Sequence, residues 1–205
     1  MFKKLATALV IASAVTAIQL PLSFDVQAAE AAKNEKKKKR PTQLVGPSVG
    51  KKVQKAFELY SADDLDGALV LLLDIEAKKA YDKAYVARFI AVMYASKGSE
   101  EAKAIQYLKQ AVAPDILNEG DHGDSIKLLA DLQMQTKKYK EALKNYEAWM
   151  EFTGKEDPQT YVKIAQAYYE LRRLDKMIAP ADKAIALFGD KQNQNPYILK
   201  LTSYY

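Results

Sequence analysis

The stretch from Thr160 to Phe188 carries two apolar helical faces in succession. The apolar or small residues of its first half, at spacings of three, one and three, are Tyr161, Ile164, Ala165 and Tyr168. Such spacing places them on one face of a helix, with a small residue where a neighbouring helix comes close. The matching residues of the second half are Leu174, Ala181, Ala184 and Ile185. The pattern therefore predicts two packed helices joined by a turn.

The same pattern occurs three more times before this stretch. We expect helix pairs at about 49–61 with 64–77, 82–96 with 100–112, and 124–136 with 139–152, before the pair that opens at Asp157-Pro158. The close-contact positions Ala56, Ala91, Ala130, Ala165 and Leu201 are 35, 39, 35 and 36 residues apart. Because each repeat buries its apolar face only against its neighbours, at least three are needed for stability. We predict four complete pairs and the first helix of a fifth, Pro196–Tyr205.

These residues give the chain a resemblance to the tetratricopeptide repeat (TPR) family from Ser48 to Tyr205. Tyr161, Ile164, Ala165 and Tyr168 stand where the family motif W-x2-L-G-x2-Y has Trp, Leu, Gly and Tyr. The resemblance implies an all-α fold, a TPR superhelix or α-solenoid of about four repeats plus the first helix of a fifth. It also implies a groove, lined by first helices, that binds peptides or proteins.

By the family pattern, eight residues of the first helices line this groove. They are Phe57, Tyr60, Tyr85, Arg88, Lys127, Asp131, Gln166 and Tyr169. A mixed aromatic and polar lining suits a protein or peptide surface, because aromatic side chains give contact area at a low entropic cost. We expect Arg88 and Lys127 to face Asp131 with opposite charge.

The first 28 residues read as an export signal. Lys3 and Lys4 precede an apolar run, and Val26-Gln27-Ala28 forms a small-residue cleavage site. We expect cleavage after Ala28 and a periplasmic location. The alternative is an uncleaved signal that anchors the protein in the inner membrane, because the run is near the lower length limit for a span.

Residues 29–47 lack apolar periodicity and predict a Lys-rich disordered tether. The formal charge of the chain is +5, of which residues 1–28 contribute +1 and residues 29–40 contribute +4, so the remainder is neutral. A neutral body argues against binding to nucleic acid. The run Lys36, Lys37, Lys38, Lys39 and Arg40 is either solvated or makes a weak contact with an anionic surface.

The sequence offers little for catalysis, so we do not expect an enzyme. There is no cysteine, which excludes thiolate chemistry and disulfides. The one histidine, His122, lies in an acidic stretch, Glu119 to Asp124, that we interpret as a turn with helix caps. An enzyme with a site near His122 is the least favoured reading. We expect no metal and no cofactor.

A narrower resemblance covers Leu44 to Ala95. This block is similar to periplasmic repeat proteins of TonB–ExbB–ExbD energy-transduction systems. The function expected is therefore a periplasmic scaffold that binds a protein or peptide partner in an envelope complex. A coordinator of cell-wall or outer-membrane assembly is the alternative with the same fold. The largely apolar segment Pro196–Tyr205 also predicts self-association through the C-terminal helix.

Overall fold

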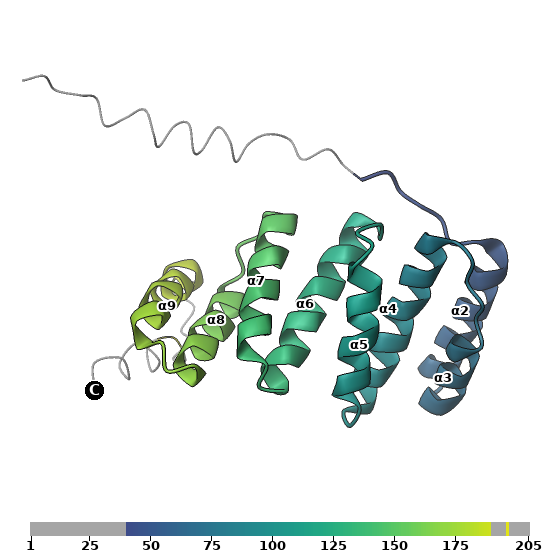
Figure 1. The fold of residues 1–205 in the computed structure, drawn as a ribbon, viewed down its shortest axis with the longest axis horizontal. Coiled ribbons are helices and arrows are strands. Elements are labelled where there is room, and N and C mark those ends of the chain that lie inside the picture. The colour runs from purple at the N-terminus through teal and green to yellow at the C-terminus, as the bar shows by residue number, and fades with distance from the viewer. Residues whose placement is uncertain (1–39, 190–195, 197–205) are drawn as a thin grey trace, which may run out of the picture. The chain divides into compact units, whose positions relative to one another are not determined.

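The computed structural model describes residues 40–189 and Pro196. Within these residues there is no strand, and eight helices lie side by side in chain order (Figure 1). The helices are α2 (Pro47–Ser61), α3 (Leu65–Leu73), α4 (Ala80–Lys97), α5 (Glu101–Val112), α6 (Glu119–Gln135), α7 (Tyr139–Thr153), α8 (Pro158–Glu170) and α9 (Leu174–Phe188). None of these helices is both long and apolar enough to cross a membrane.

The helices form four pairs, α2 with α3, α4 with α5, α6 with α7, and α8 with α9. Each helix packs most extensively against the other member of its pair, and each pair packs next against the pair that follows it in the chain. The buried core continues across the pair boundaries. Leu129 of α6, for example, joins the cluster built mainly by the first two pairs. The predicted arrangement of helix pairs is confirmed.

The predicted close-contact alanines are almost inaccessible to solvent. Ala56 is 1% exposed, and Ala91, Ala130 and Ala165 are each 0% exposed. Seven residues after each of them the backbone enters the left-handed region, at Asp63 (φ 66°), Gly98 (φ 65°), Lys137 (φ 58°) and Arg172 (φ 58°). Each of these residues lies in the turn between the two helices of a pair. The repeat register derived from the alanines is therefore correct.

Two helix boundaries near the N-terminus differ from the prediction. Helix α2 begins at Pro47, two residues before the expected start at residue 49, and Gly46 is its N-cap; proline suits a first helical position because its missing N–H needs no partner there. Helix α3 ends at Leu73, not at Ala77. Ile75 and Ala77 are half-buried against the core while Glu76 is exposed. This alternation suits an extended segment, which explains the early end of the helix.

The acidic stretch around His122 is helical, so its interpretation as a turn was wrong. Helix α6 begins at Glu119, five residues earlier than expected. Carboxylates in a first helical turn are favourable, because they lie near the positive end of the helix dipole. A Cβ atom on Gly123 would lie 3.0 Å from Cγ2 of Thr153. Gly123 therefore serves the close approach of α7 and does not mark a loop.

The last part of the predicted tether is held against the helices. Residues 40–46 are not helical, but Arg40 and Gln43 hydrogen-bond to the connection between α5 and α6. Residues 40–46 belong to the same compact unit as the helices. The export signal, residues 29–39 with Lys36 to Lys39, and the fifth-repeat helix after Pro196 lie outside the described residues.

Candidate interaction surface

The first helices α2, α4, α6 and α8 carry the eight predicted groove residues, and we call the surface that these residues form the first-helix face. Its α2–α4 half is aromatic. The rings of Phe57 and Tyr60 lie 6.2 Å apart, and Tyr85 lies 6.0 Å from Tyr81 and 5.1 Å from Phe89. The side chain of Phe57 is 52% exposed, although burial of a phenylalanine side chain is favourable in free energy. This half therefore presents aromatic surface that the fold itself leaves uncovered.

The α6–α8 half of the first-helix face is ionic. The ammonium of Lys127 lies 3.0 Å from Oδ2 of Asp157, 2.7 Å from the hydroxyl of Thr160 and 4.5 Å from the ring centre of Trp149. Asp157 also caps α8 by accepting from the main-chain N–H groups of Gln159 and Thr160. Burial raises the pKa of Asp157, but the hydrogen bonds from Thr160 and Lys127 outweigh it and lower the pKa. This carboxylate joins α6 to α8 and stays ionised.

Asp131 forms a second link between repeats. Its Oδ1 accepts hydrogen bonds from the hydroxyl of Tyr146 on α7 at 2.6 Å and from the ammonium of Lys163 on α8 at 2.7 Å. Three helices from two repeats therefore meet at one carboxylate. Burial and the hydrogen bond to Asp131 raise the pKa of the Tyr146 hydroxyl, which remains a proton donor.

Arg88 and Lys127, which were expected to face Asp131 with opposite charge, form their ion pairs with other carboxylates. Arg88 pairs with Asp121 of α6, with 3.2 Å between Nη2 and Oδ1, and Lys127 pairs with Asp157. Each cation therefore reaches the first helix of the following repeat. Successive first helices lie close enough for side chains to bridge them. Each of these two cations is therefore paired with a carboxylate of the next repeat.

The two remaining predicted residues lie on α8. Gln166 is exposed, and the Tyr169 ring lies 5.9 Å from the guanidinium carbon of Arg172. Sequence reasoning did not place the bridging residues Asp121, Thr160 and Lys163 on this face. Lys163 lies three residues, about one helical turn, before the predicted face residue Gln166, and this spacing was an available signal. The predicted residues thus form an aromatic group on α2 and α4. On α6, Lys127 and Asp131 are instead tied by separate ion pairs to the next repeat.

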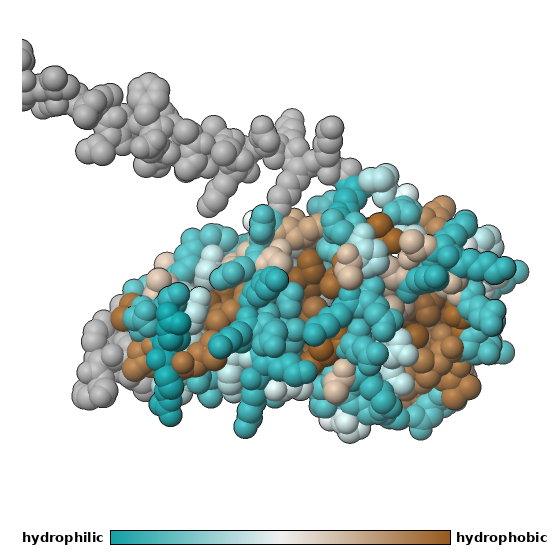
Figure 2. Space-filling model, viewed as in Figure 1, coloured by the Kyte–Doolittle hydropathy of each residue, from teal (hydrophilic) through white to brown (hydrophobic). Residues whose placement is uncertain are grey.

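A second exposed apolar group lies on α3. Val70 is 70% exposed and Leu73 is 48% exposed. Figure 2 shows hydrophobic side chains gathered over the α2–α3 end of the array. The first repeat therefore exposes apolar side chains from both of its helices, whereas exposed apolar residues scattered singly would need no explanation.

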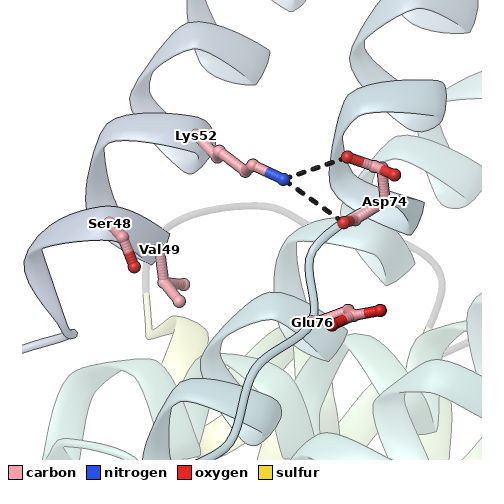
Figure 3. A pocket seen from close by; sticks show the side chains of 5 residues that line it. All are labelled: Ser48, Val49, Lys52, Asp74 and Glu76. Atoms are coloured by element: carbon pink, nitrogen blue, oxygen red, sulfur yellow. Dashed lines mark hydrogen bonds and ion pairs between the residues drawn. The ribbon is translucent and has the colours of Figure 1, made fainter.

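A small open hollow of about 270 Å³ lies between α2 and the segment that follows α3. It is lined by Ser48, Val49, Lys52, Asp74 and Glu76 (Figure 3). The Lys52 ammonium donates hydrogen bonds to Oδ2 of Asp74 at 3.0 Å and to the main-chain carbonyl oxygen of Asp74 at 3.3 Å. The hollow contains no nucleophile paired with a base, so its chemistry is that of a surface ion pair.

His122 is a buried packing residue. It is 5% exposed, its Nε2 lies 3.0 Å from Oδ1 of Asp115, and its ring lies 4.8 Å from that of Phe152. Its Nδ1 is buried without a hydrogen-bond partner. Among residues 40–189, no three His, Asp or Glu side chains lie close enough together to hold a metal ion. A substrate would have no access to this imidazole.

The environment of His122 makes the stability of the protein depend on pH. Burial lowers its pKa and Arg40 adds to this, while Asp115 opposes it. As pH falls, His122 is therefore protonated in the unfolded chain before it is protonated in the folded protein. The free energy of unfolding then decreases below about pH 6.5, at most by about 1.4 kcal/mol per pH unit. Urea unfolding of the wild type and of His122→Gln at pH 7.5 to 5.5 measures this. Parallel profiles for the two proteins would contradict it.

Comparison with protein families and with curated proteins gives no match for this sequence. Several solved structures are similar. The structure called MamA 41-end, from Desulfovibrio magneticus RS-1, superposes with a TM-score of 0.65 at 17% identity, over 78% of this chain and 88% of that one. MamA MSR-1 gives a TM-score of 0.60 at 18% identity, over 78% and 86%. The TPR-like repeats of a putative kinesin light chain from Podosopora anserina give 0.56 at 14%, over 77% and 85%. The protein is an all-α, TPR-like solenoid.

Proposed function

We propose that the protein is an interaction scaffold that binds a polypeptide partner on its first-helix face, with the aromatic α2–α4 half as the main contact. The exposure of Phe57 carries this proposal, because an aromatic ring beside Tyr60 that the fold leaves uncovered is the kind of residue that anchors protein interfaces. The bridged charges of the α6–α8 half are already paired, so they contribute orientation more than affinity.

A matched pair of variants tests which face binds. Phe57 on α2 and Leu73 on α3 are 52% and 48% exposed, so replacing either by alanine should cost little stability. We expect Phe57→Ala to weaken partner binding by about tenfold or more, as for an interface anchor, and Leu73→Ala to leave it unchanged.

The measurement is quantitative crosslinked capture from envelope extract, with the captured partner then purified and titrated against each variant. Weakening by Leu73→Ala alone would place the binding surface on the second helices and overturn the proposal. The double variant Tyr60→Ala/Tyr169→Ala is titrated in the same way. It tests whether the partner also contacts the α8 end of the face.

The cellular setting is proposed from the sequence. The export signal and the resemblance of Leu44 to Ala95 favour a periplasmic scaffold of a TonB-type energy-transduction system. Coordination of cell-wall or outer-membrane assembly is the alternative. The identity of the captured partner separates the two, since one predicts components of an energy-transduction complex and the other predicts synthesis or assembly enzymes. Self-association through the C-terminal segment remains a prediction that sedimentation of the purified protein can test.

A further inference from the structure

Residues 40–46, which we call the strap, lie in a site built by three parts of the fold. These are the start of α4 (Tyr81 and Asp82), the connection from Asp115 to Asn118, and Phe152 near the end of α7, and together we call them the edge site. The edge site includes none of the predicted groove residues. The strap is held in this site by three kinds of interaction.

The first interaction recognises an arginine. Nη1 of Arg40 donates to the carbonyl oxygens of Asp115 at 2.9 Å and Leu117 at 3.3 Å, and Nη2 lies 2.5 Å from Oδ1 of Asp115. The guanidinium carbon lies 4.6 Å from the ring centre of Phe152. Two carbonyls, one carboxylate and one aromatic face match the planar, forked guanidinium, which a lysine ammonium cannot reproduce.

The second interaction clamps the main chain. Oδ1 of Asn118 accepts from the N–H of Gln43 at 2.8 Å, and its Nδ2 donates to the carbonyl oxygen of Gln43 at 3.1 Å. The same Nδ2 donates to the Tyr81 hydroxyl at 2.9 Å, which fixes the amide orientation. Although Asn118 precedes α6, its side chain makes no capping hydrogen bond to that helix. The side chain is committed to the strap backbone instead.

The third interaction seats the end of the strap. The N–H of Gly46 donates to Oδ1 of Asp82 at 3.0 Å, and Asp82 is only 5% exposed. A Cβ on residue 46 would lie 2.9 Å from the Asp82 carboxylate and would displace this hydrogen-bonded side chain, so the position favours glycine. Val45 packs on two core clusters, whereas the side chain of Leu44 is 88% exposed and contributes nothing to recognition.

We infer that the edge site is a second polypeptide-binding site, which binds an extended segment. In this chain its own strap occupies the site. Its ligand has arginine at the first position, a residue other than proline at the fourth, an apolar residue at the sixth and glycine at the seventh. A partner that carries such a segment must displace the strap. This function is independent of the first-helix face, which lies on other residues.

The strap has a concentration advantage over any competitor. Gly46 is joined directly to α2 through Pro47, so the effective concentration of the strap at the edge site is about millimolar or higher. A separate peptide at micromolar concentration therefore cannot compete with the intact strap. It can compete once the strap loses its arginine and its Gln43 N–H.

The experiment uses the full chain and a fluorescent peptide with the sequence of Lys38 to Gly46. Three proteins are titrated: the wild type, the strap variant Arg40→Gln/Gln43→Pro, and the strap variant that also carries Asn118→Ala. The strap lies outside the helices and Asn118 makes no cap bond, so all three should keep their helicity by circular dichroism. If the double strap variant loses helicity, Arg40→Gln alone replaces it.

We expect the peptide to bind the strap variant at least tenfold more tightly than the wild type, and Asn118→Ala to remove that gain. A peptide with glutamine in place of its arginine should bind none of the proteins. Equal binding to the wild type and the strap variant, no binding to any of them, or binding that survives Asn118→Ala would each overturn the inference.

Discussion

Ala165→Leu should lower the free energy of unfolding by about 1–3 kcal/mol, the usual cost of forcing extra carbon atoms into a packed contact. Ala165 is 0% exposed and packs against Met177 and Ala181 of α9. The added carbon atoms must either push α8 and α9 apart or displace the partly buried side chains of Tyr168, Tyr169 and Leu174 that pack around this contact. Denaturant unfolding followed by circular dichroism measures the loss.

Gln166→Leu is the matched control for Ala165→Leu. It introduces the same side chain one residue later, where the position is exposed, so the free energy of unfolding should change by less than about 0.5 kcal/mol. Because stability in a solenoid is a sum of repeat and neighbour contributions, hydrogen exchange in Ala165→Leu should accelerate in α8 and α9 before it does in α2 to α5. Equal losses for the two variants would contradict the register.

The repeat register was predictable because it rests on small residues, which recur wherever two helices of a pair touch. The turns between the helices were less visible. Gly98 marks one of them, but Asp63, Lys137 and Arg172 adopt the same left-handed conformation without being glycine. A residue with a Cβ in that region costs about 1 kcal/mol or more, so the rest of the repeat imposes the conformation and the turn residue does not reveal it.

The charge pairs on the first-helix face could not be derived from spacing alone. Lys127 and Asp131 are four residues apart on one helix, a spacing that often forms an ion pair. Each of them instead bonds to α8, to Asp157 and Lys163 respectively. The choice depends on how far one repeat is rotated against the next, and this rotation is set by the packing of several side chains at once.

The strap was overlooked because its composition is that of a linker. It contains a proline and a glycine, Pro41 and Gly46, and four lysines precede it. The one available signal was Arg40 at the end of a lysine run, since arginine is the residue suited to fixed, multidentate contacts. Arg40 was expected, with those lysines, to be solvated or to touch an anionic surface. Arg40 instead bonds Asp115, so the contact with an anionic surface stays a prediction for Lys36 to Lys39.

Asp131→Ala should lower the free energy of unfolding by about 1–3 kcal/mol, because it leaves a buried hydroxyl donor within the third repeat without an acceptor. That donor is Tyr146, which is 0% exposed and hydrogen-bonded to Asp131 at 2.6 Å. Tyr146→Phe removes the same hydrogen bond from the other side but leaves Asp131 paired with Lys163 at 2.7 Å. The two changes should therefore not be additive.

A double-mutant cycle separates the buried hydrogen bond from the exposed ion pair. With Phe at position 146, Asp131→Ala leaves no buried hydroxyl without an acceptor. We therefore expect a coupling energy of about 0.5–3 kcal/mol between the two positions. Lys163 is 37% exposed in its side chain, so Lys163→Met should cost only about 0–1 kcal/mol. Urea unfolding of the four proteins of the cycle and of Lys163→Met supplies these values. Additive losses at positions 131 and 146, with the larger loss at Lys163, would mean that Asp131 contributes to stability through its ion pair with α8 and not through the Tyr146 hydroxyl.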